Sequence, residues 1–245
     1  MPVLQVQNLS KHFGGLSAVG GLSFDLSSNE ILALIGPNGA GKTTAINLIS
    51  GTYFPDSGDV MLSGKSVVKM RPHDRCRMGL ARTFQRAKIF STLSIYENSK
   101  VGATFGRPAS QEGHEELINR ALRTVGLGDR RDAIAESLNT ANKKKLQIAI
   151  ALAANPTVLL LDEPMAGLSL NEIQEFQRLI KDLREQGMAI LIVEHLMESL
   201  AEVTDRAIVM NEGRKLIEGT LKEVLNDARV INAYLGQKHA GSKGP

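Results

Sequence analysis

The stretch GPNGAGKTT, from Gly36 to Thr44, constrains the fold of this chain more than any other part of its sequence. It fits the pattern G-x-x-x-x-G-K-[ST], and it lies between the apolar run ILALI (31–35) and the helical pattern AINLIS (45–50). Glycines in such a loop let backbone N–H groups turn inward around phosphate oxygens, and the following helix adds the partial positive charge of its N-terminus. The pattern therefore predicts an α/β fold with a phosphate-binding loop between a buried strand and a helix.

The residue types within this loop predict which phosphates it binds. Lys42 can place a point charge on the β- and γ-phosphates of a nucleotide, and the hydroxyl group of Thr43 can ligate the accompanying Mg²⁺. We therefore predict that a nucleoside triphosphate is bound by the whole stretch: Gly36, Pro37, Asn38, Gly39, Ala40, Gly41, Lys42, Thr43 and Thr44.

Two later stretches end in polar residues that suit phosphate chemistry. TVLLLDEP delivers Asp162 and Glu163 to the end of one apolar run, and AILIVEH delivers His195 to the end of another. Ligands gather at the carboxyl ends of the strands in open α/β sheets. We expect Asp162 to hold Mg²⁺ through its water shell and Glu163 to orient and deprotonate an attacking water molecule. We expect His195 to face the γ-phosphate.

Short apolar runs predict most of the remaining fold. Continuously apolar runs are typical of buried parallel strands, whereas runs separated by glycine-containing turns are typical of antiparallel ones. The predicted parallel strands are 31–35, 157–161 and 189–194, and the predicted antiparallel strands are 3–7, 22–26 and 59–64. An apolar stripe predicts a helix over 170–186, and residues 206–210 and 214–219 predict one more hairpin.

Between residues 86 and 156 the strand patterns stop. Helices are predicted over 91–103 and 115–128, the second ending at a glycine. We therefore expect a single domain with an inserted helical subdomain and a disordered tail. The core and its N-terminal antiparallel part take residues 1–85 and 157–236, the helical subdomain takes 86–156, and the tail takes 237–245.

The composition limits the location and the partners of the chain. A net charge of +3 without a block of basic residues argues against nucleic-acid binding, and the lone Cys76 fits a reducing compartment. No apolar run approaches the roughly 18 residues of a membrane span, and the N-terminus lacks the pattern of a secretion signal. We expect a cytoplasmic protein.

Among nucleotide-binding proteins, the motifs favour one family. The N-K-x-D motif that reads guanine is incomplete in NKKK (142–145), and the helical region lacks the clear cluster of lid arginines that a small-molecule kinase needs. GPNGAGKTT, ARTFQ, LLLDEP and VEH, in this order and spacing, resemble the ATP-binding subunit of an ABC transporter, over roughly residues 3–236. GLARTFQ, LDEPMAGL, EHLMESLAEVTDRAIVMNEGRKLIEGT and DARVINAYLG are similar to the branched-chain amino-acid importer type.

The resemblance implies roles for particular side chains. Phe13 is expected to stack on the adenine of ATP. Gln85 is expected to touch Mg²⁺ and the attacking water molecule and to sense the membrane subunit. Glu163 corresponds to the general base, and His195 corresponds to the switch histidine.

The resemblance also implies that two subunits enclose two ATP molecules, each held by one subunit's loop and the other's L-S-x-G-Q signature. Here Leu138 occupies the first signature position, but Asn139, Thr140, Ala141 and Asn142 follow it. If the backbone at Ala141 is left-handed, as glycine would allow, the alanine costs about 1–2 kcal/mol. We then expect a heterodimer with two unequal sites, and a homodimer stays open as the alternative.

Three lysines, residues 143–145, follow this degenerate signature at the start of a predicted helix. The helix N-terminus carries partial positive charge and disfavours cations. The lysines therefore either point at the γ-phosphate held by the partner subunit or extend into water.

The implied partners are integral membrane permeases, a second ATP-binding subunit and, indirectly, a solute-binding protein, at the inner face of the membrane. We expect a permease helix to dock around Gln85 and residues 86–98, where Phe90, Leu93 and Tyr96 are predicted to be exposed. The solute stays open among amino acids, urea and short amides. Two other functions stay open: a non-transport ABC ATPase acting on nucleic acid or ribosomes, and a regulatory nucleotide-binding subunit with little turnover.

Overall fold

Three runs of aliphatic residues form the centre of the larger sheet. In the computed structural model, which describes residues 2–85, 87–108, 113–195 and 197–240, they are the fully buried strands β3 (Ile31–Ile35), β7 (Val158–Asp162) and β8 (Ala189–Val193). The predicted parallel strands are therefore confirmed, each to within one residue at either end. The sheet has the order β10-β9-β3-β8-β7-β6. The strand β6 (Leu80–Arg82) is parallel to β7, and β9 (Arg206–Asn211) is parallel to β3, whereas β10 (Arg214–Gly219) is antiparallel to β9.

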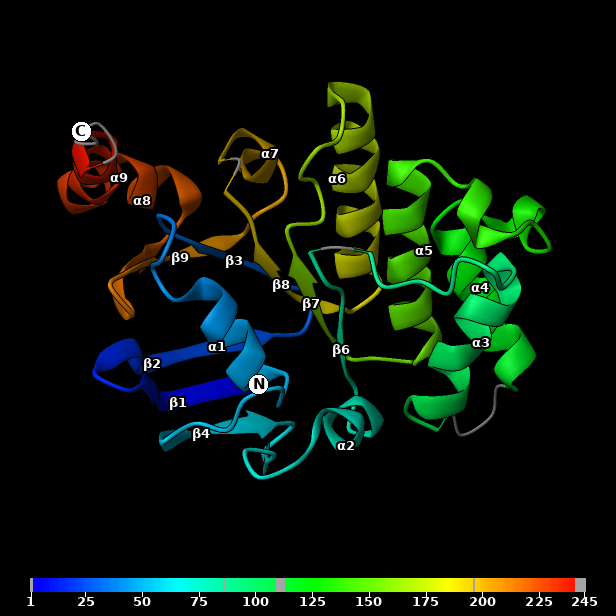
Figure 1. Ribbon diagram of the computed structural model, residues 1–245, viewed down its shortest axis with the longest axis horizontal. Helices are drawn as coiled ribbons and strands as arrows, with labels where there is room; N and C mark the ends of the chain where they lie inside the picture. Colours follow the sequence, from blue (N-terminus) through cyan, green and yellow to red (C-terminus); the bar gives the residue numbers. More distant parts are fainter. Residues whose placement is uncertain (1, 86, 109–112, 196, 241–245) are drawn as a thin grey trace.

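The N-terminal part of the chain forms a second, antiparallel sheet, as predicted (Figure 1). Its order is β2-β1-β4-β5, with β1 (Pro2–Phe13), β2 (Leu16–Ser27), β4 (Ser57–Leu62) and β5 (Lys65–Ser66). The two long strands extend well beyond the predicted runs 3–7 and 22–26, because most of their neighbouring residues also join the ladder between them.

Each parallel strand shares its side chains between two cores. Along β3, Leu32 and Leu34 pack with helix α1 (Lys42–Ile49) and the antiparallel sheet, whereas Ile31, Ala33 and Ile35 pack on the opposite face. Side chains alternate between the faces of a strand, so a continuous apolar run is needed when both faces are covered. Helix α1 consequently lies between the two sheets (Figure 1).

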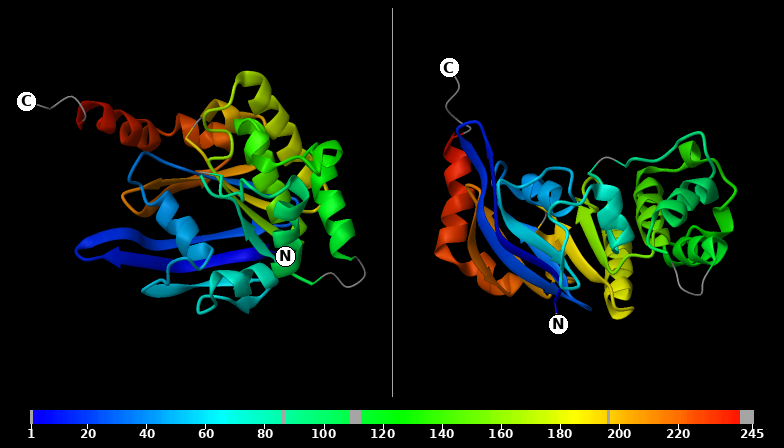
Figure 2. Two further views of the ribbon diagram at one scale, coloured as in Figure 1. Left: turned by 45° about the vertical axis from the view of Figure 1, so that its right-hand side comes forward. Right: turned by 90° about the horizontal axis from the view of Figure 1, so that it is seen from below.

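The other face of the larger sheet, and its β6 edge, carry most of the helices. Figure 2 shows α3, α4 and α5 as a group standing to one side of the sheet. The helices are α2 (Pro72–Arg77), α3 (Ile95–Phe105), α4 (His114–Thr124), α5 (Thr140–Ala153), α6 (Leu170–Glu185), α7 (Met197–Ala201), α8 (Leu221–Asn226) and α9 (Ala228–Ala240), with short 3₁₀ turns at Gly128–Arg130 and Ala135–Ser137.

Local capping explains where two helices depart from their predicted bounds. Helix α3 begins at Ile95 rather than residue 91, because Ser94 and Glu97 form a capping box. Helix α4 ends at Thr124 rather than 128, because Gly126 is left-handed (φ 72°) and ends it. A glycine does end this helix, but it is Gly126 rather than Gly128, the last residue of the predicted range.

The predicted tail begins too early. Helix α9 continues to Ala240, so residues 237–240 are helical rather than disordered. Between Gly236 and Gly241 the chain has no glycine or proline to stop a helix. Residues 241–245 of the same prediction lie outside the described residues. Within the described ranges, no helix combines the length and apolar character needed to cross a membrane.

Arg75 ties the end of α1 to the segment that follows β5. Its side chain is fully buried, and its guanidinium group donates hydrogen bonds to four backbone carbonyls, those of Leu48, Ile49, Val68 and Met70, at 2.7–3.1 Å. Leu48 and Ile49 end α1, where carbonyls lack partners within the helix. Burial lowers the pKa of Arg75 to about 10, which still leaves it charged at neutral pH.

We expect Arg75→Met to lower the free energy of unfolding by about 3 kcal/mol or more, because buried carbonyls lose their donors. Arg77→Met, an exposed arginine on the same helix, changes the charge equally and should stay within about 0.5 kcal/mol of the parent. Urea unfolding of both variants measures the difference. Equal midpoints for the two would contradict this role of Arg75.

Candidate active site

The loop between β3 and α1 is held tightly between two strands. Gly36 (φ 150°) lies against β9, where a Cβ atom would collide with the carbonyl oxygen of Met210. Gly41 (φ 99°) lies against β2, where a Cβ atom would collide with the carbonyl oxygen of Ala18. Glycine is needed at both positions for the close approach and for the positive φ. The neighbouring strands thus fix the shape of the loop.

The ammonium group of Lys42 lies inside this loop. Lys42 is only 8% exposed, and its Nζ donates to the carbonyl oxygens of Gly36 at 2.6 Å and Pro37 at 3.0 Å. Burial lowers the pKa of Lys42, while the nearby carboxylates of Glu163 and Asp162 raise it. The loop carbonyls therefore hold a cation at the place where the sequence predicts phosphate oxygens.

A groove of about 700 Å³ runs from Phe13 past the loop to Glu163. The Phe13 ring is 44% exposed and meets the Tyr53 ring edge-on, with centroids 5.5 Å apart. An aromatic face at one end and a carboxylate at the other suit a ligand with a base and a chain of phosphates. The groove is lined by Phe13, Leu16, Ser17, Ala18, Asn38, Gly39, Ala40, Gly41, Lys42, Thr43, Thr44, Glu163 and Glu212.

Four of these lining residues were missed by sequence reasoning: Leu16, Ser17, Ala18 and Glu212. The glycine pair Gly14–Gly15 after Phe13 was an available signal for the first three. It turns the chain so that the start of β2 runs back beside the end of β1. Glu212 sits in the turn between β9 and β10, and nothing in its local sequence marks it.

Gln85, Glu163 and His195 come together at the carboxyl ends of three adjacent strands, β6, β7 and β8. Gln85 Nε2 donates to Glu163 Oε2 at 2.7 Å, and His195 Nδ1 lies 3.7 Å from the same oxygen. Parallel pairing of β6 with β7 and of β7 with β8 brings the three strand ends to one edge. The structure thus places the three predicted side chains in one cluster, with Glu163 at its centre.

Asp162 occupies a drier position than its neighbour. It is 6% exposed, and its Oδ2 accepts a hydrogen bond from Arg82 at 2.9 Å. The same guanidinium donates to Asn47 and Ser50 at the end of α1. Sequence reasoning missed Arg82, since its partners are distant in the chain. The ion pair balances the buried charge of Asp162.

The predicted metal ligands offer few protein oxygens. Among the described residues, no group of three or more His, Cys, Asp or Glu side chains is placed to hold a metal ion by itself. Thr43 is exposed on the groove, Gln85 lies at its Glu163 end, and Asp162 is turned toward Arg82. This sparse set fits Mg²⁺ that takes most of its ligands from phosphate oxygens and water.

The residues at the degenerate signature form the start of α5. Asn139 is the N-cap, and its Oδ1 accepts a hydrogen bond from the backbone N–H of Asn142 at 2.9 Å. Ala141 is buried in the first helical turn, so its backbone is right-handed and the strain that we considered there is absent. The reason is that the cap at Asn139 starts the helix before Ala141. Of the described residues that line the groove, none belongs to 139–142.

Lys144 and Lys145 neither extend into water nor point at a phosphate of a partner subunit, the two possibilities that the sequence left open. Lys144 Nζ donates to the backbone carbonyls of Glu163 at 2.9 Å and Pro164 at 3.0 Å. Lys145 pairs with Glu175 of α6 at 2.7 Å. Both cations thus have partners within their own chain, and these partners offset the unfavourable position at a helix start.

Comparison with known proteins identifies the family. The family profile described as ABC transporter matches residues 19–166, which is more than half of the chain. This chain belongs to the ABC transporter family. It is an ATP-hydrolysing subunit of a transporter, and the predicted P-loop fold of the ABC type is confirmed. A second profile, described as branched-chain amino acid ATP-binding cassette transporter, matches residues 214–240.

Curated ABC relatives carry two different transport names. The high-affinity branched-chain amino acid transport ATP-binding protein LivG of Salmonella typhimurium is 37% identical over 96% of this chain and 98% of its own length. The lipopolysaccharide export system ATP-binding protein LptB of Haemophilus influenzae is 32% identical over 97% and 99%. The crystal structure of an ABC transporter's ATP-binding cassette in its ADP conformation superposes with a TM-score of 0.88, at 28% identity over 96% of this chain and 99% of the other.

We expect Lys42→Ala to weaken ATP binding by at least about tenfold, because the loop loses its charged donor. Lys65→Ala, which removes an exposed lysine of β5, is the matched control and should bind ATP like the parent. Isothermal titration of both purified variants measures the dissociation constants. Equal affinity in the two would show that Lys42 does not bind the phosphates.

Proposed function

We propose that this subunit energises the import of branched-chain or related amino acids. The observation that carries the proposal is that two independent matches, one to the C-terminal part of the chain and one to nearly its whole length, have the same description. The C-terminal profile match over 214–240 is described by branched-chain amino acid transport, and the LivG relatives share that description across nearly the whole length. The LptB relatives, at 32–34% identity, belong to lipopolysaccharide export systems. Lipopolysaccharide is therefore the competing substrate, and export is the competing direction of transport.

For hydrolysis, we assign the groove and its end cluster to different tasks. Phe13 would stack on the adenine, and the loop with Lys42 would hold the phosphates. Glu163 would take a proton from the attacking water while Gln85 orients that water, and His195 beside the same carboxylate would contact the γ-phosphate. Mg²⁺, held near Thr43, Gln85 and Asp162, would neutralise part of the phosphate charge.

The start of α5 would serve a second ATP-binding subunit. Asn139 and Thr140 are exposed there, at the N-terminus of a helix, a setting that favours anions. In this proposal, the start of α5 faces an ATP molecule that is bound by the phosphate loop of the second subunit. Because Ala141 carries no backbone strain, the case for two unequal sites rests only on the altered side chains of residues 139–142.

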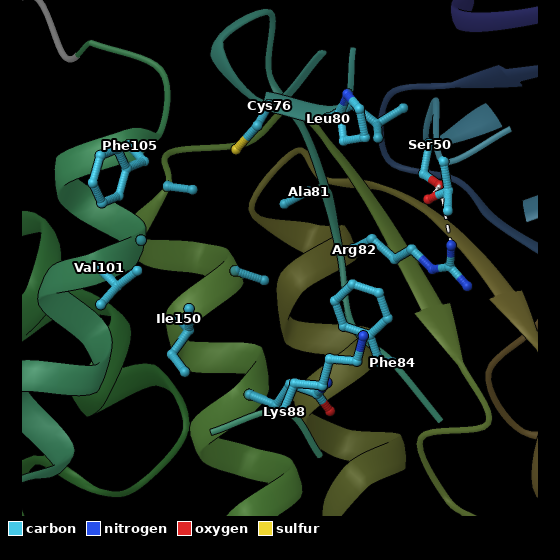
Figure 3. A pocket seen from close by; sticks show the side chains of 16 residues that line it. Ser50, Cys76, Leu80, Ala81, Arg82, Phe84, Lys88, Val101, Phe105 and Ile150 are labelled. Atoms are coloured by element: carbon cyan, nitrogen blue, oxygen red, sulfur yellow. Dashed lines mark hydrogen bonds between the residues drawn. The ribbon is translucent and has the colours of Figure 1, made fainter. Parts of the chain in front are cut away.

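The permease would dock in an apolar groove between β6 and the helical part of the chain. Figure 3 shows Phe84, Ala81 and Leu80 along one wall and Val101, Phe105 and Ile150 along the other, around a cavity of about 280 Å³. Phe105 is 60% exposed and Phe84 36%. An apolar cleft with exposed aromatic rings suits the apolar face of a short helix.

The three docking residues expected from the sequence, Phe90, Leu93 and Tyr96, differ from one another in their exposure. Phe90 is 54% exposed, as predicted. Tyr96 is part-buried rather than exposed, because its hydroxyl group donates to Glu115 and the Arg131 guanidinium lies over its ring at 4.3 Å. Leu93 is half-buried. The groove of Figure 3 adds Phe84 and Phe105, which sequence reasoning missed.

We expect Glu163→Gln to keep ATP binding and to slow hydrolysis by about 10²–10⁴-fold, the usual worth of a general base. The measurement is single-turnover hydrolysis by the assembled transporter complex, with the ATP affinity of the chain determined in parallel. Glu198→Gln, a carboxylate of α7, is the control. Hydrolysis by Glu163→Gln at the parent rate would show that Glu163 is not the base.

The same variant tests the solute in cells. Cells that carry only the Glu163→Gln chain should lose uptake of radiolabelled leucine that the parent chain supports. Normal leucine uptake together with impaired lipopolysaccharide export would replace the proposed solute by the competing one.

The docking groove contains the chain's only cysteine, which allows a direct test. We expect Cys76 to cross-link to single cysteines placed on cytoplasmic loops of the co-purified permease. Burial raises the pKa of the Cys76 thiol, so cross-linking should improve as the pH is raised above neutral, where more thiolate forms. Cys76→Ser should abolish the product. An active complex without any cross-link to Cys76 would contradict docking in this groove.

A further inference from the structure

The turn that follows β7 runs from Glu163 to Met165, and all its polar backbone groups form hydrogen bonds. The N–H of Glu163 donates to the carbonyl of Val193 at 2.9 Å. The carbonyls of Glu163 and Pro164 both accept hydrogen bonds from Lys144 Nζ, at 2.9 and 3.0 Å. The N–H of Met165 donates to the carboxylate of Glu194 at 2.8 Å. The peptide unit between Pro164 and Met165 is therefore held at both ends by side chains, those of Lys144 and Glu194.

This turn needs such support because of its backbone geometry. Glu163 has φ 49°, the left-handed region that a residue with a Cβ atom rarely adopts. Conformations of this kind persist where the surroundings over-determine them, and they concentrate at functional sites. Here the left-handed turn directs the Glu163 side chain to Gln85 and His195.

The two charged partners of the turn come from different parts of the fold. Glu194 follows β8, is fully buried, and also accepts a hydrogen bond from the N–H of His195 at 3.2 Å. Lys144 is part-buried and comes from α5, one helical turn after Thr140 and Ala141 of the degenerate signature. Among the described residues that bond this turn, Lys144 is therefore the only one that comes from the signature helix.

We propose that Lys144 is a positioning residue for Glu163, which it holds in the left-handed turn by bonding the Glu163 and Pro164 carbonyls. The proposal rests on the proposed function of Glu163 as the general base. Lys144 touches no substrate in this role. Because it stands on α5, movement of the signature residues against the partner's ATP would reach the base of this subunit's own site through Lys144.

The test compares variants of the full-length chain in the assembled transporter complex. Lys144→Met should slow single-turnover hydrolysis by about 10- to 100-fold, the size of effect expected when a catalytic group is displaced by about an ångström. Its ATP dissociation constant should stay within about twofold of the parent, since no ground-state contact with ATP is lost. Lys144→Arg should keep most of the rate, because its forked donors can bond both carbonyls.

Two controls separate positioning from general effects. Lys145→Met removes the same charge from the same helix, loses only the Glu175 pair, and should hydrolyse ATP like the parent. In the Glu163→Gln background, Lys144→Met should add no more than about a twofold loss, because both changes act through the same group. If Lys144→Met melts more than about 10 °C below the parent, Lys144→Leu, which also lacks a donor, replaces it with the same expectations.

Several outcomes would overturn the proposal. A parent-like rate for Lys144→Met, a large rise in its dissociation constant at an unchanged rate, or an undiminished loss in the Glu163→Gln background would each do so. If Glu163→Gln alone hydrolyses at the parent rate, the base assignment fails and this proposal fails with it. If Glu163→Gln is slow but Lys144→Met is normal, only the role of Lys144 is refuted.

Discussion

The close contact of the phosphate loop with its two neighbouring strands is the constraint on which the rest of the structure depends. Gly36 against Met210 and Gly41 against Ala18 leave no room for side chains, so the course of the loop between β3 and α1 requires glycine at both positions. That course buries the ammonium group of Lys42 among loop carbonyls. The packing of α1 between the two sheets, and the groove that starts at Phe13, both follow from it.

The two adjacent carboxylates after β7 have different surroundings because they lie on either side of a strand end. Asp162 is still within the parallel ladder, is nearly buried, and is balanced by Arg82. Glu163 is past the ladder, in a left-handed turn that exposes its carboxylate to the groove. A buried charge requires a partner in the protein, and Arg82 is that partner for Asp162. At Glu163 the nearby cation, Lys144, bonds the backbone carbonyl instead of the carboxylate.

Features with a local physical signal could be predicted from the sequence, and features made by long-range side chains could not. Continuous aliphatic runs predicted β3, β7 and β8, and the parallel arrangement of their ends correctly implied that Glu163 and His195 would meet. Arg75 and Lys144 bond backbone carbonyls of other segments, and no spacing in the chain reveals such contacts. The backbone strain considered at Ala141 is absent, because the Asn139 cap, rather than a glycine pattern, determines where α5 begins.

Two lysines near Glu163 are expected to behave oppositely when ATP binds, and one measurement tests this directly. It is the crystal structure of the Glu163→Gln chain with ATP and Mg²⁺. We predict that Lys42 Nζ leaves the Gly36 and Pro37 carbonyls for the β- and γ-phosphates, while Lys144 Nζ stays on the carbonyls of residues 163 and 164. Nucleotide bound outside the groove between Phe13 and residue 163, or Lys144 found on a phosphate, would contradict the account.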